Sequence, residues 1–188
     1  MRSTLGIDYG SKKAGTTAIA YVEAGLLHVE QSVKGKDADR FVREVVEARG
    51  PAVVYLDAPL SLPGVYRGAG TDYHYRKADR ALGGMSPMFL GGLTARAMSL
   101  AATLREAGHE VIEVYPAHTA RLQFPDAGYR SDLEPFTAAL TKHLPHPLAT
   151  PPASWHAVDA VVAWWIGWRH QAGEATPVGD AKEGVVWI

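Results

Sequence analysis

Residues 52–56 read AVVYL and are followed directly by Asp57-Ala58-Pro59. Five apolar residues in a row, bounded by turn-forming residues, are typical of a short strand that is buried on both faces. Strands of this kind occur inside α/β sheets, where helices cover both sides. This stretch therefore predicts an α/β fold, and it places an acidic residue at the carboxyl end of the strand.

The residues before this strand predict that part of the sheet is antiparallel. Ser3–Asp8 is a short apolar run that ends in an acid, residues 16–22 form a second, β-branched run, and residues 26–33 alternate as a third strand. Short turns separate the three runs, which favours an antiparallel meander. A helical pattern over residues 38–48 then leads into the buried strand.

The residues after the buried strand alternate between helix and strand. Helical patterns cover residues 93–107, 132–143 and 154–170, a strand is expected at 110–115, and residues 184–188 add a small edge strand. Crossover connections between parallel strands are right-handed, which puts the first strand at the centre. The sequence thus predicts an α/β fold with a five-stranded mixed sheet, in the order 3-2-1-4-5, flanked by helices.

Composition narrows the class of protein. The chain has 188 residues, a formal net charge of −1 and no cysteine, which predicts a single domain over residues 1–188 without disulfides or thiolate metal sites. We find no apolar run of 18 residues and no signal-peptide pattern, so we expect a cytoplasmic protein with no membrane partner. The overall charge produces no general attraction to nucleic acid, so any such surface must come from a local cluster of bases.

Acidic residues end several of the predicted elements. Asp8 ends the first strand and Asp57 ends its expected parallel neighbour, about 4.8 Å away, at the edge where α/β sheets bind ligands. Asp159 interrupts the apolar last helix, with His156 three residues earlier on the same face. Glu113 lies near the end of the following strand and approaches from the other side. We expect these residues to gather at one place.

Clustered carboxylates repel one another unless a cation neutralises them. Oxygen ligands suit Mg²⁺ or Mn²⁺, and two such ions about 3.5–4 Å apart activate a water and stabilise the leaving oxygen of a phosphodiester. The cluster therefore indicates metal-dependent phosphoryl chemistry. Structural interpretations stay open for single residues: Asp8 and Asp57 can initiate turns, Glu113 can face solvent, and His156 can cap or pack.

Several short motifs resemble those of known nucleases. Gly6-Ile7-Asp8-Tyr9-Gly10 is similar to the first motif of ribonuclease-H-like nucleases, and His156-Ala157-Val158-Asp159-Ala160 resembles the final-helix motif of the Holliday-junction resolvase branch. The chain is more similar to a family of predicted ribonuclease-H-like nucleases, to which we assign LDAPL at 56–60, RKADR at 76–80 and EVYP at 113–116. The resemblance spans nearly the whole chain.

The resemblance implies a ribonuclease-H-like fold with Asp8, Asp57 and Asp159 as metal ligands. Glu113 and His156 would be auxiliary catalytic residues that orient water or shuttle a proton. Resolvases usually carry Glu at the second position, where this chain has Asp57, and the shorter side chain changes the reach to the metal. We therefore expect a hydrolase: a nuclease that uses two Mg²⁺ or Mn²⁺ ions and acts on DNA or RNA.

Other function classes stay open at this stage. One alternative is a nucleic-acid- or nucleotide-binding module that has the same fold but no catalytic activity. Another is a small-molecule phosphoesterase, which would use the same metals. An ATPase related to actin and sugar kinases has a similar first motif. However, this chain is roughly half the length that such a two-domain ATPase needs, and its Asp57 is followed by Ala-Pro rather than glycine.

Residues at about 60–92 form a loop-rich insertion that is long enough to be functional. In its segment 66–80, four basic residues outnumber two acidic ones and aromatic residues lie between them. Cations beside aromatic faces suit single-stranded nucleic acid. The residues expected to bind substrate are Lys12, Lys13, Arg67, Tyr73, Arg76, Lys77 and Arg80. Ordinary ion pairs, such as Arg76 with Asp79, are the structural alternative.

The last expected helix is rich in tryptophan. The four side chains recur at helical spacing, at Trp155, Trp164, Trp165 and Trp168. Such spacing is typical of a core-facing surface or of a homodimer interface, and the sequence leaves both interpretations open.

Overall fold

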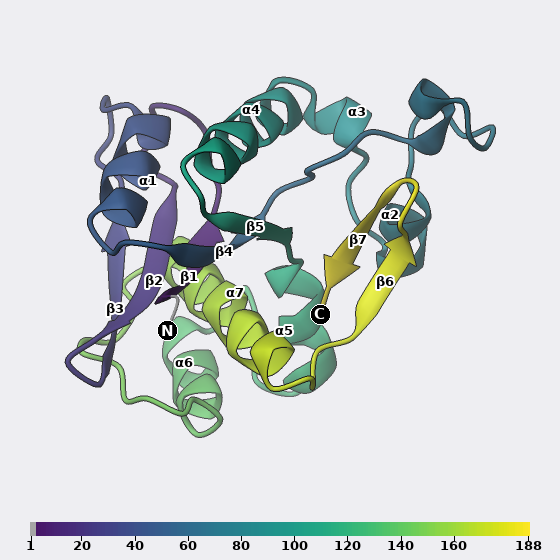
Figure 1. Ribbon diagram of the computed structural model, residues 1–188. Helices are drawn as coiled ribbons and strands as arrows, with labels where there is room; N and C mark the ends of the chain where they lie inside the picture. The colour runs from purple at the N-terminus through teal and green to yellow at the C-terminus, as the bar shows by residue number, and fades with distance from the viewer. Residues whose placement is uncertain (1–2) are drawn as a thin grey trace.

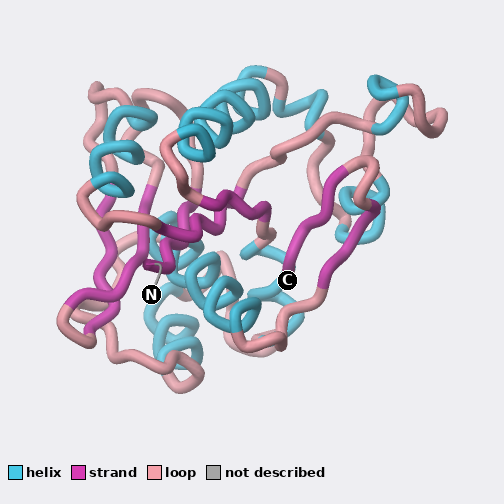
Figure 2. Tube along the Cα trace, viewed as in Figure 1, coloured by secondary structure: helices cyan, strands magenta, loops and turns pink. Residues whose placement is uncertain are grey.

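The computed structural model describes residues 3–188 and is drawn in Figures 1 and 2. Its strands are β1 (Ser3–Asp8), β2 (Ala18–Glu23), β3 (Leu26–Gln31), β4 (Ala52–Asp57), β5 (Glu110–Glu113), β6 (Pro177–Asp180) and β7 (Gly184–Trp187). Its helices are α1 (Ala38–Glu47), α2 (Lys77–Leu82), α3 (Pro87–Leu90), α4 (Gly92–Glu106), α5 (Pro116–Gln123), α6 (Leu133–Thr141) and α7 (Trp155–Gln171), with a 3₁₀ turn, η1, at Gly64–Arg67.

The first five strands form one mixed sheet in the order β3-β2-β1-β4-β5. β1 and β3 each pair antiparallel with β2, whereas β1 and β5 each pair parallel with β4. The predicted α/β class, the strand order 3-2-1-4-5 and the flanking helices are therefore confirmed. The C-terminal strand differs from expectation, because β7 pairs with β6 in a separate antiparallel hairpin that the sequence did not predict.

Side chains that alternate along the central strands divide the core in two. Leu5, Ile7 and Leu56 belong to the cluster that packs under α1 and α4. Tyr55 belongs to the cluster on the opposite face, beneath α7. Figure 1 shows α1 and α4 on one side of the sheet and α7 on the other. Successive residues of a strand point to opposite faces of the sheet, so a residue's place in this alternation decides which helices its side chain contacts.

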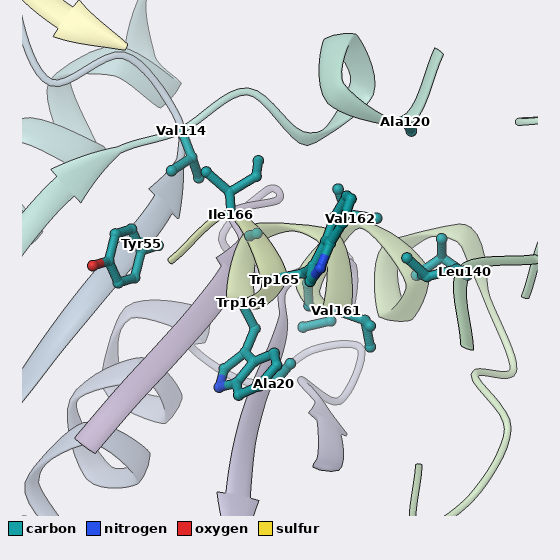
Figure 3. Packing of buried hydrophobic residues seen from close by; sticks show 14 of the residues in the cluster. Ala20, Tyr55, Val114, Ala120, Leu140, Val161, Val162, Trp164, Trp165 and Ile166 are labelled. Carbon is teal, nitrogen blue, oxygen red and sulfur yellow. The ribbon is translucent and has the colours of Figure 1, made fainter. Parts of the chain in front are cut away.

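Helix α7 supplies much of the core on its side of the sheet. Trp164 and Trp165 are 3% and 6% exposed, and Figure 3 shows them packed among residues of the strands and of other helices. Trp168, at 38%, is far more exposed. Ser154 caps the helix by accepting a hydrogen bond from the backbone N–H of Ala157. Two of the four tryptophans therefore serve the core of this chain.

A glycine sets the distance between α7 and β1. A Cβ built at Gly6 would lie 2.0 Å from the backbone nitrogen of Trp164 and 2.5 Å from the carbonyl oxygen of Ala160. Only a residue without a side chain permits this approach. Because Ala160 follows Asp159, the contact also fixes how closely Asp159 approaches the end of β1.

The predicted insertion contains η1, α2 and α3 and lies at one end of the molecule beside the β6–β7 hairpin (Figures 1 and 2). Ala78 and Leu82 of α2 pack with Val186 of β7 in a small third core. The insertion is thus held by the C-terminal hairpin. None of the helices described between residues 3 and 188 combines the length and hydropathy that crossing a bilayer requires.

Candidate active site

Two aspartates lie next to each other at the carboxyl ends of the central parallel strands. Asp8 is the last residue of β1, Asp57 is the last residue of β4, and the strand register places them opposite one another. Neighbouring strands are about 4.8 Å apart. Asp57 lies two residues after Tyr55 on β4, so its side chain points to the same face of the sheet, which α7 covers. Asp8 is paired with Asp57 in the register and points to that face as well.

Helix α7 brings a third aspartate and a histidine to the same place. Asp159 is 1% exposed, so its carboxylate is buried. One turn earlier, Nδ1 of His156 lies 2.6 Å from Oδ2 of Asp8. The side chains of Asp8 and His156 are 13% and 37% exposed, which places them on the open side of the cluster. The structure thus brings together Asp8, Asp57, Asp159 and His156, four of the five expected catalytic residues.

The loop between α5 and α6 supplies two side chains that bind Asp159. The hydroxyl of Tyr129 donates a hydrogen bond to Oδ1 of Asp159 at 2.8 Å, and the guanidinium of Arg130 donates to Oδ2. Neither residue was predicted from the sequence. They lie in a polar loop about 30 residues before Asp159, and no local pattern distinguishes them from ordinary surface residues.

Burial and neighbouring charges raise the pKa of two of the carboxylates. Burial, followed by the charges of Asp8 and Asp159, raises the pKa of Asp57 well above its ordinary value. Burial and the charge of Asp8 raise the pKa of Asp159 to about 7, although Arg130 and Tyr129 act in the opposite direction. The bond to Asp8 raises the pKa of His156. Ionisation of all three aspartates is therefore disfavoured in the absence of a further cation.

The same contacts determine how well the cluster fits a metal ion. Among the side chains of residues 3–188, no group of three or more His, Asp or Glu is arranged to hold one. Both carboxylate oxygens of Asp159 bind Tyr129 or Arg130, so Asp159 is not a free ligand. Asp8 and Asp57 form an adjacent pair of oxygen donors, which suits Mg²⁺ or Mn²⁺. The oxygen donors thus fit an ion bound by Asp8 and Asp57. They do not fit an ion that also binds Asp159, because Tyr129 and Arg130 occupy its carboxylate.

Glu113 does not join the cluster, and its expected catalytic role is corrected. In the register of β4 and β5 it pairs with Leu56 rather than with Asp57, so its side chain belongs to the opposite face. There it is 7% exposed and accepts hydrogen bonds from Nη1 and Nη2 of Arg76 at 2.8 and 2.6 Å and from the backbone N–H of Leu60 at 2.8 Å. Strand alternation, applied strictly, carries this information in the sequence.

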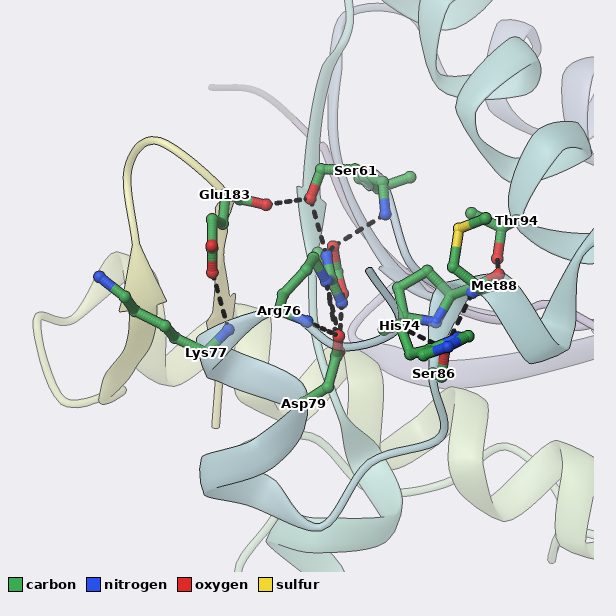
Figure 4. A network of polar contacts seen from close by, with 12 residues as sticks. Ser61, His74, Arg76, Lys77, Asp79, Ser86, Met88, Thr94 and Glu183 are labelled. Carbon is green, nitrogen blue, oxygen red and sulfur yellow. Dashed lines mark hydrogen bonds and ion pairs between the residues drawn. The ribbon is translucent and has the colours of Figure 1, made fainter. Parts of the chain in front are cut away.

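Arg76 is also corrected, because it was expected to bind substrate and is instead 1% exposed. Besides Glu113, its guanidinium binds Asp79, with 2.7 Å between Nη2 and Oδ1, and the hydroxyl of Ser61 at 2.8 Å. Figure 4 shows this network, which Glu183 extends to the C-terminal hairpin. The structural alternative, an ion pair of Arg76 with Asp79, is what the structure contains.

The other residues expected to bind substrate lie at the surface. Three of the cations form exposed ion pairs: Lys12 with Asp37 at 3.2 Å, Lys77 with Asp180 at 2.7 Å, and Arg80 with Asp72 at 2.9 Å. Such pairs are weak and can exchange their partner for a phosphate. Lys13, Arg67 and Tyr73 are exposed. A cavity of about 540 Å³ is lined by Lys77 and Arg80 among others, and none of the three aspartates lines it.

The fold and the cluster define a class of protein: an α/β domain with convergent carboxylates at the carboxyl edge of its central parallel strands. Comparison with models of protein families, with curated proteins and with solved structures found no match for this chain. Any inference about the function of the site therefore depends on the residues of this chain alone.

Proposed function

We propose that this chain is a metal-dependent phosphodiester hydrolase, a nuclease of ribonuclease-H-like fold that uses Mg²⁺ or Mn²⁺. The observation that carries the proposal is the pairing of Asp8 with Asp57 at the ends of adjacent parallel strands, beside the buried Asp159 of α7. Catalytic sites of open α/β sheets lie at this edge.

A divalent cation suits the site because the carboxylates lack balancing positive charge. Burial and then repulsion from Asp8 and Asp159 raise the pKa of Asp57, and an ion bound between Asp8 and Asp57 would relieve both. When bound, such an ion supplies Lewis-acid activation of a water and stabilises charge on the phosphate oxygens. The two aspartates would hold it, and their half-buried position leaves one side open to substrate.

His156 is placed to manage a proton. Its Nδ1 is bound to Asp8, which orients the ring, and its side chain is 37% exposed on the open side of the cluster. Nε2 is then the nitrogen that would exchange a proton with water or with the leaving oxygen. This arrangement supports a general acid–base role, with Asp8 as the positioning partner.

Nucleic acid is the proposed source of the phosphodiester. The insertion carries the exposed residues Arg67 and Tyr73, and the guanidinium carbon of Arg80 lies 3.7 Å from the centroid of the Tyr75 ring. Cations combined with aromatic rings bind phosphates and unstacked bases. Lys13, which follows the Asp8 strand, adds a further exposed cation.

One observation favours a second candidate, a nucleic-acid- or nucleotide-binding module without catalysis. Asp159 is engaged by Tyr129 and Arg130, and a carboxylate used in this way can serve the fold alone. Calorimetric titration with Mn²⁺ separates the two candidates, because a pure binding module has no need of a metal at Asp8 and Asp57.

The central experiment compares the wild-type protein with Asp8→Asn on single-stranded, duplex, branched and hybrid nucleic acids, with Mn²⁺ or with EDTA. We expect Mn²⁺-dependent cleavage that the substitution lowers at least about 100-fold while thermal unfolding stays cooperative. Asp126→Asn, the same change at an exposed loop position, is the matched control and should cleave normally. Equal cleavage by Asp8→Asn and wild type would overturn the mechanism.

A further inference from the structure

Arg130 places a fixed positive charge inside the acidic cluster. Its guanidinium binds Oδ2 of Asp159, and its Nε donates to the hydroxyl oxygen of Tyr129 at 3.2 Å. That same hydroxyl donates to Oδ1 of Asp159. The three side chains thus form a closed ring of hydrogen bonds around one buried carboxylate.

The backbone holds Arg130 in an unusual conformation. Its φ is +69°, in the left-handed region that residues with a side chain seldom adopt. The next turn is secured by Ser131 and Asp132, whose N–H groups both donate to the carbonyl of Gly128 at 2.9 Å. Backbone strain that the surrounding structure maintains is typical of functional sites, where it fixes the direction of a side chain.

Arg130 faces both the protein and the solvent. The carboxylate that it binds, Asp159, is 1% exposed, whereas the side chain of Arg130 is 44% exposed. A guanidinium has five N–H donors in a planar fork that matches a phosphate, so Asp159 and Tyr129 leave donors available on the solvent side. Arg130 is bound to Asp159 of the acidic cluster, whereas Lys77 and Arg80 of the insertion are paired with carboxylates outside the cluster.

The charge of Arg130 acts on all three aspartates. It offsets part of the rise in the pKa of Asp57 and of Asp159, and the charges of Asp159 and Asp8 help to raise the pKa of Arg130 against the effect of burial. The guanidinium therefore lies within electrostatic reach of the cluster and supplies a positive charge there, as the second cation of a two-ion site would.

Resting on the proposed function, we propose that Arg130 takes the place of a second metal ion: one divalent ion binds Asp8 and Asp57, and Arg130, held on Asp159, binds the phosphate that is cleaved. In the hydrolysis a water oxygen bonds to phosphorus and the ester P–O bond breaks. One proton of the water goes to a base and the leaving oxygen takes up a proton. Arg130 stabilises the negative charge on the phosphate oxygens during this exchange.

The test begins with calorimetric titration of Mn²⁺ alone into the wild-type protein and three variants. Arg130→Gly removes the charge and suits the left-handed backbone, Arg130→Lys keeps a charge, and Arg121→Ala is the matched control. The guanidinium carbon of Arg121 also lies 5.3 Å from the Tyr129 ring centroid, like that of Arg130. We expect one ion per chain in wild type, Arg130→Lys and Arg121→Ala, and two in Arg130→Gly, because Oδ2 of Asp159 becomes free to bind an ion.

The second readout is hydrolysis of bis(p-nitrophenyl) phosphate. At Mn²⁺ levels that fill one site, we expect Arg130→Gly to lower kcat by about 100-fold or more. From that level the rate of Arg130→Gly should rise in proportion to the Mn²⁺ concentration as a second ion binds, whereas the wild-type rate is already saturated with one ion. Arg121→Ala should follow wild type. Thermal unfolding of each variant checks the fold, and Arg130→Lys, with a partial loss of kcat, tests the role should Arg130→Gly not fold.

The outcomes distinguish this inference from the proposed function. Two ions in wild type, with Arg130→Gly unchanged in stoichiometry and kcat, would overturn the role of Arg130 and leave the metal-dependent hydrolase intact. Absence of both Mn²⁺ binding and hydrolysis in wild type would overturn the proposed function, and the inference with it.

Discussion

Two clusters of ionised residues lie on opposite faces of the same sheet and differ in how their charge is balanced. On the α4 side, Arg76 binds Glu113 and Asp79, and all three are less than 10% exposed. On the α7 side, three aspartates share the charges of Arg130 and a histidine, and the site is open at its edge. The same residue types thus form a buried network of ion pairs in one case and a partly exposed cluster of neighbouring aspartates in the other.

The pKa values follow this difference. Burial raises the pKa of Glu113, and its bonds to Arg76 offset part of that rise. For Asp57, burial and the like charges of its neighbours act in the same direction. In a structural network each carboxylate is paired with a cation of the protein. In a site that binds a cation, carboxylates lie close together and perturb one another's pKa. The comparison therefore supports the proposed site on the α7 side.

The largest effect on stability is expected from Arg76→Met. The substitution leaves Glu113 and Asp79 buried without their cation, so we expect a loss of about 3–5 kcal/mol in the free energy of unfolding. Denaturation in urea measures it. The contrast with the open cluster is tested by Arg130→Gly, which should cost clearly less because its side chain is 44% exposed. Equal losses would mean that both clusters are structural.

A smaller effect is expected from Gly6→Ala. The added methyl group would meet the backbone of Trp164 and Ala160, and α7 must move away from β1 at a cost of about 1–3 kcal/mol. Because α7 carries Asp159, Mn²⁺ affinity or hydrolysis should fall as well, while the Arg76 network stays intact. Gly92→Ala, where a Cβ meets nothing within 4 Å, is the control. An unchanged site in Gly6→Ala would show that the helix does not position the cluster.

The pH dependence of stability should separate the open cluster from the closed one. The pKa of Asp159 is about 7 in the folded chain against an ordinary 3.8, so the folded state binds more protons than the unfolded state between these values. Stability should therefore rise as the pH falls from about 7 toward 4 in EDTA. His156 contributes in the same direction, since its raised pKa adds stability below its ordinary 6.5 that is lost at higher pH.

Urea denaturation of wild type and Asp159→Asn at about pH 5 and about pH 8 measures this effect. The variant should show the weaker dependence on pH. If both proteins show the same dependence, Asp159 does not titrate in this range and the cluster is better balanced than its contacts suggest.

The smallest changes in stability are expected from two substitutions on neighbouring strands, Asp57→Asn and Glu113→Gln, which should act in opposite directions. Without metal, Asp57→Asn removes a repelled charge and should stabilise the fold by about 1 kcal/mol, whereas Glu113→Gln weakens the bonds to Arg76 and should destabilise it. Thermal unfolding of both variants in EDTA gives the two signs. Destabilisation by Asp57→Asn would place Asp57 among the structural carboxylates.

Much of the fold followed from local patterns. The buried run AVVYL, the three closely spaced strands before it and the short turns between them led to the observed strand order. Asp8 and Asp57 were found because strand ends can be located from apolar runs, and His156 and Asp159 because their spacing places them on one helical face. The expected place of Glu113 was wrong because the register between β4 and β5 pairs it with Leu56 and turns its side chain to the opposite face.

Local patterns in the chain were therefore enough to identify the sheet, its central strands and the acids at their ends, because apolar periodicity is set by neighbours along the sequence. Folding alone decided which charges are balanced. Arg76 meets Glu113 across 37 residues, and Arg130 meets Asp159 across 29. An arginine of either kind looks the same in the sequence, since burial and pairing depend on distances in space. Those distances bury one cluster as a network of ion pairs and leave the other partly exposed, with its aspartates side by side.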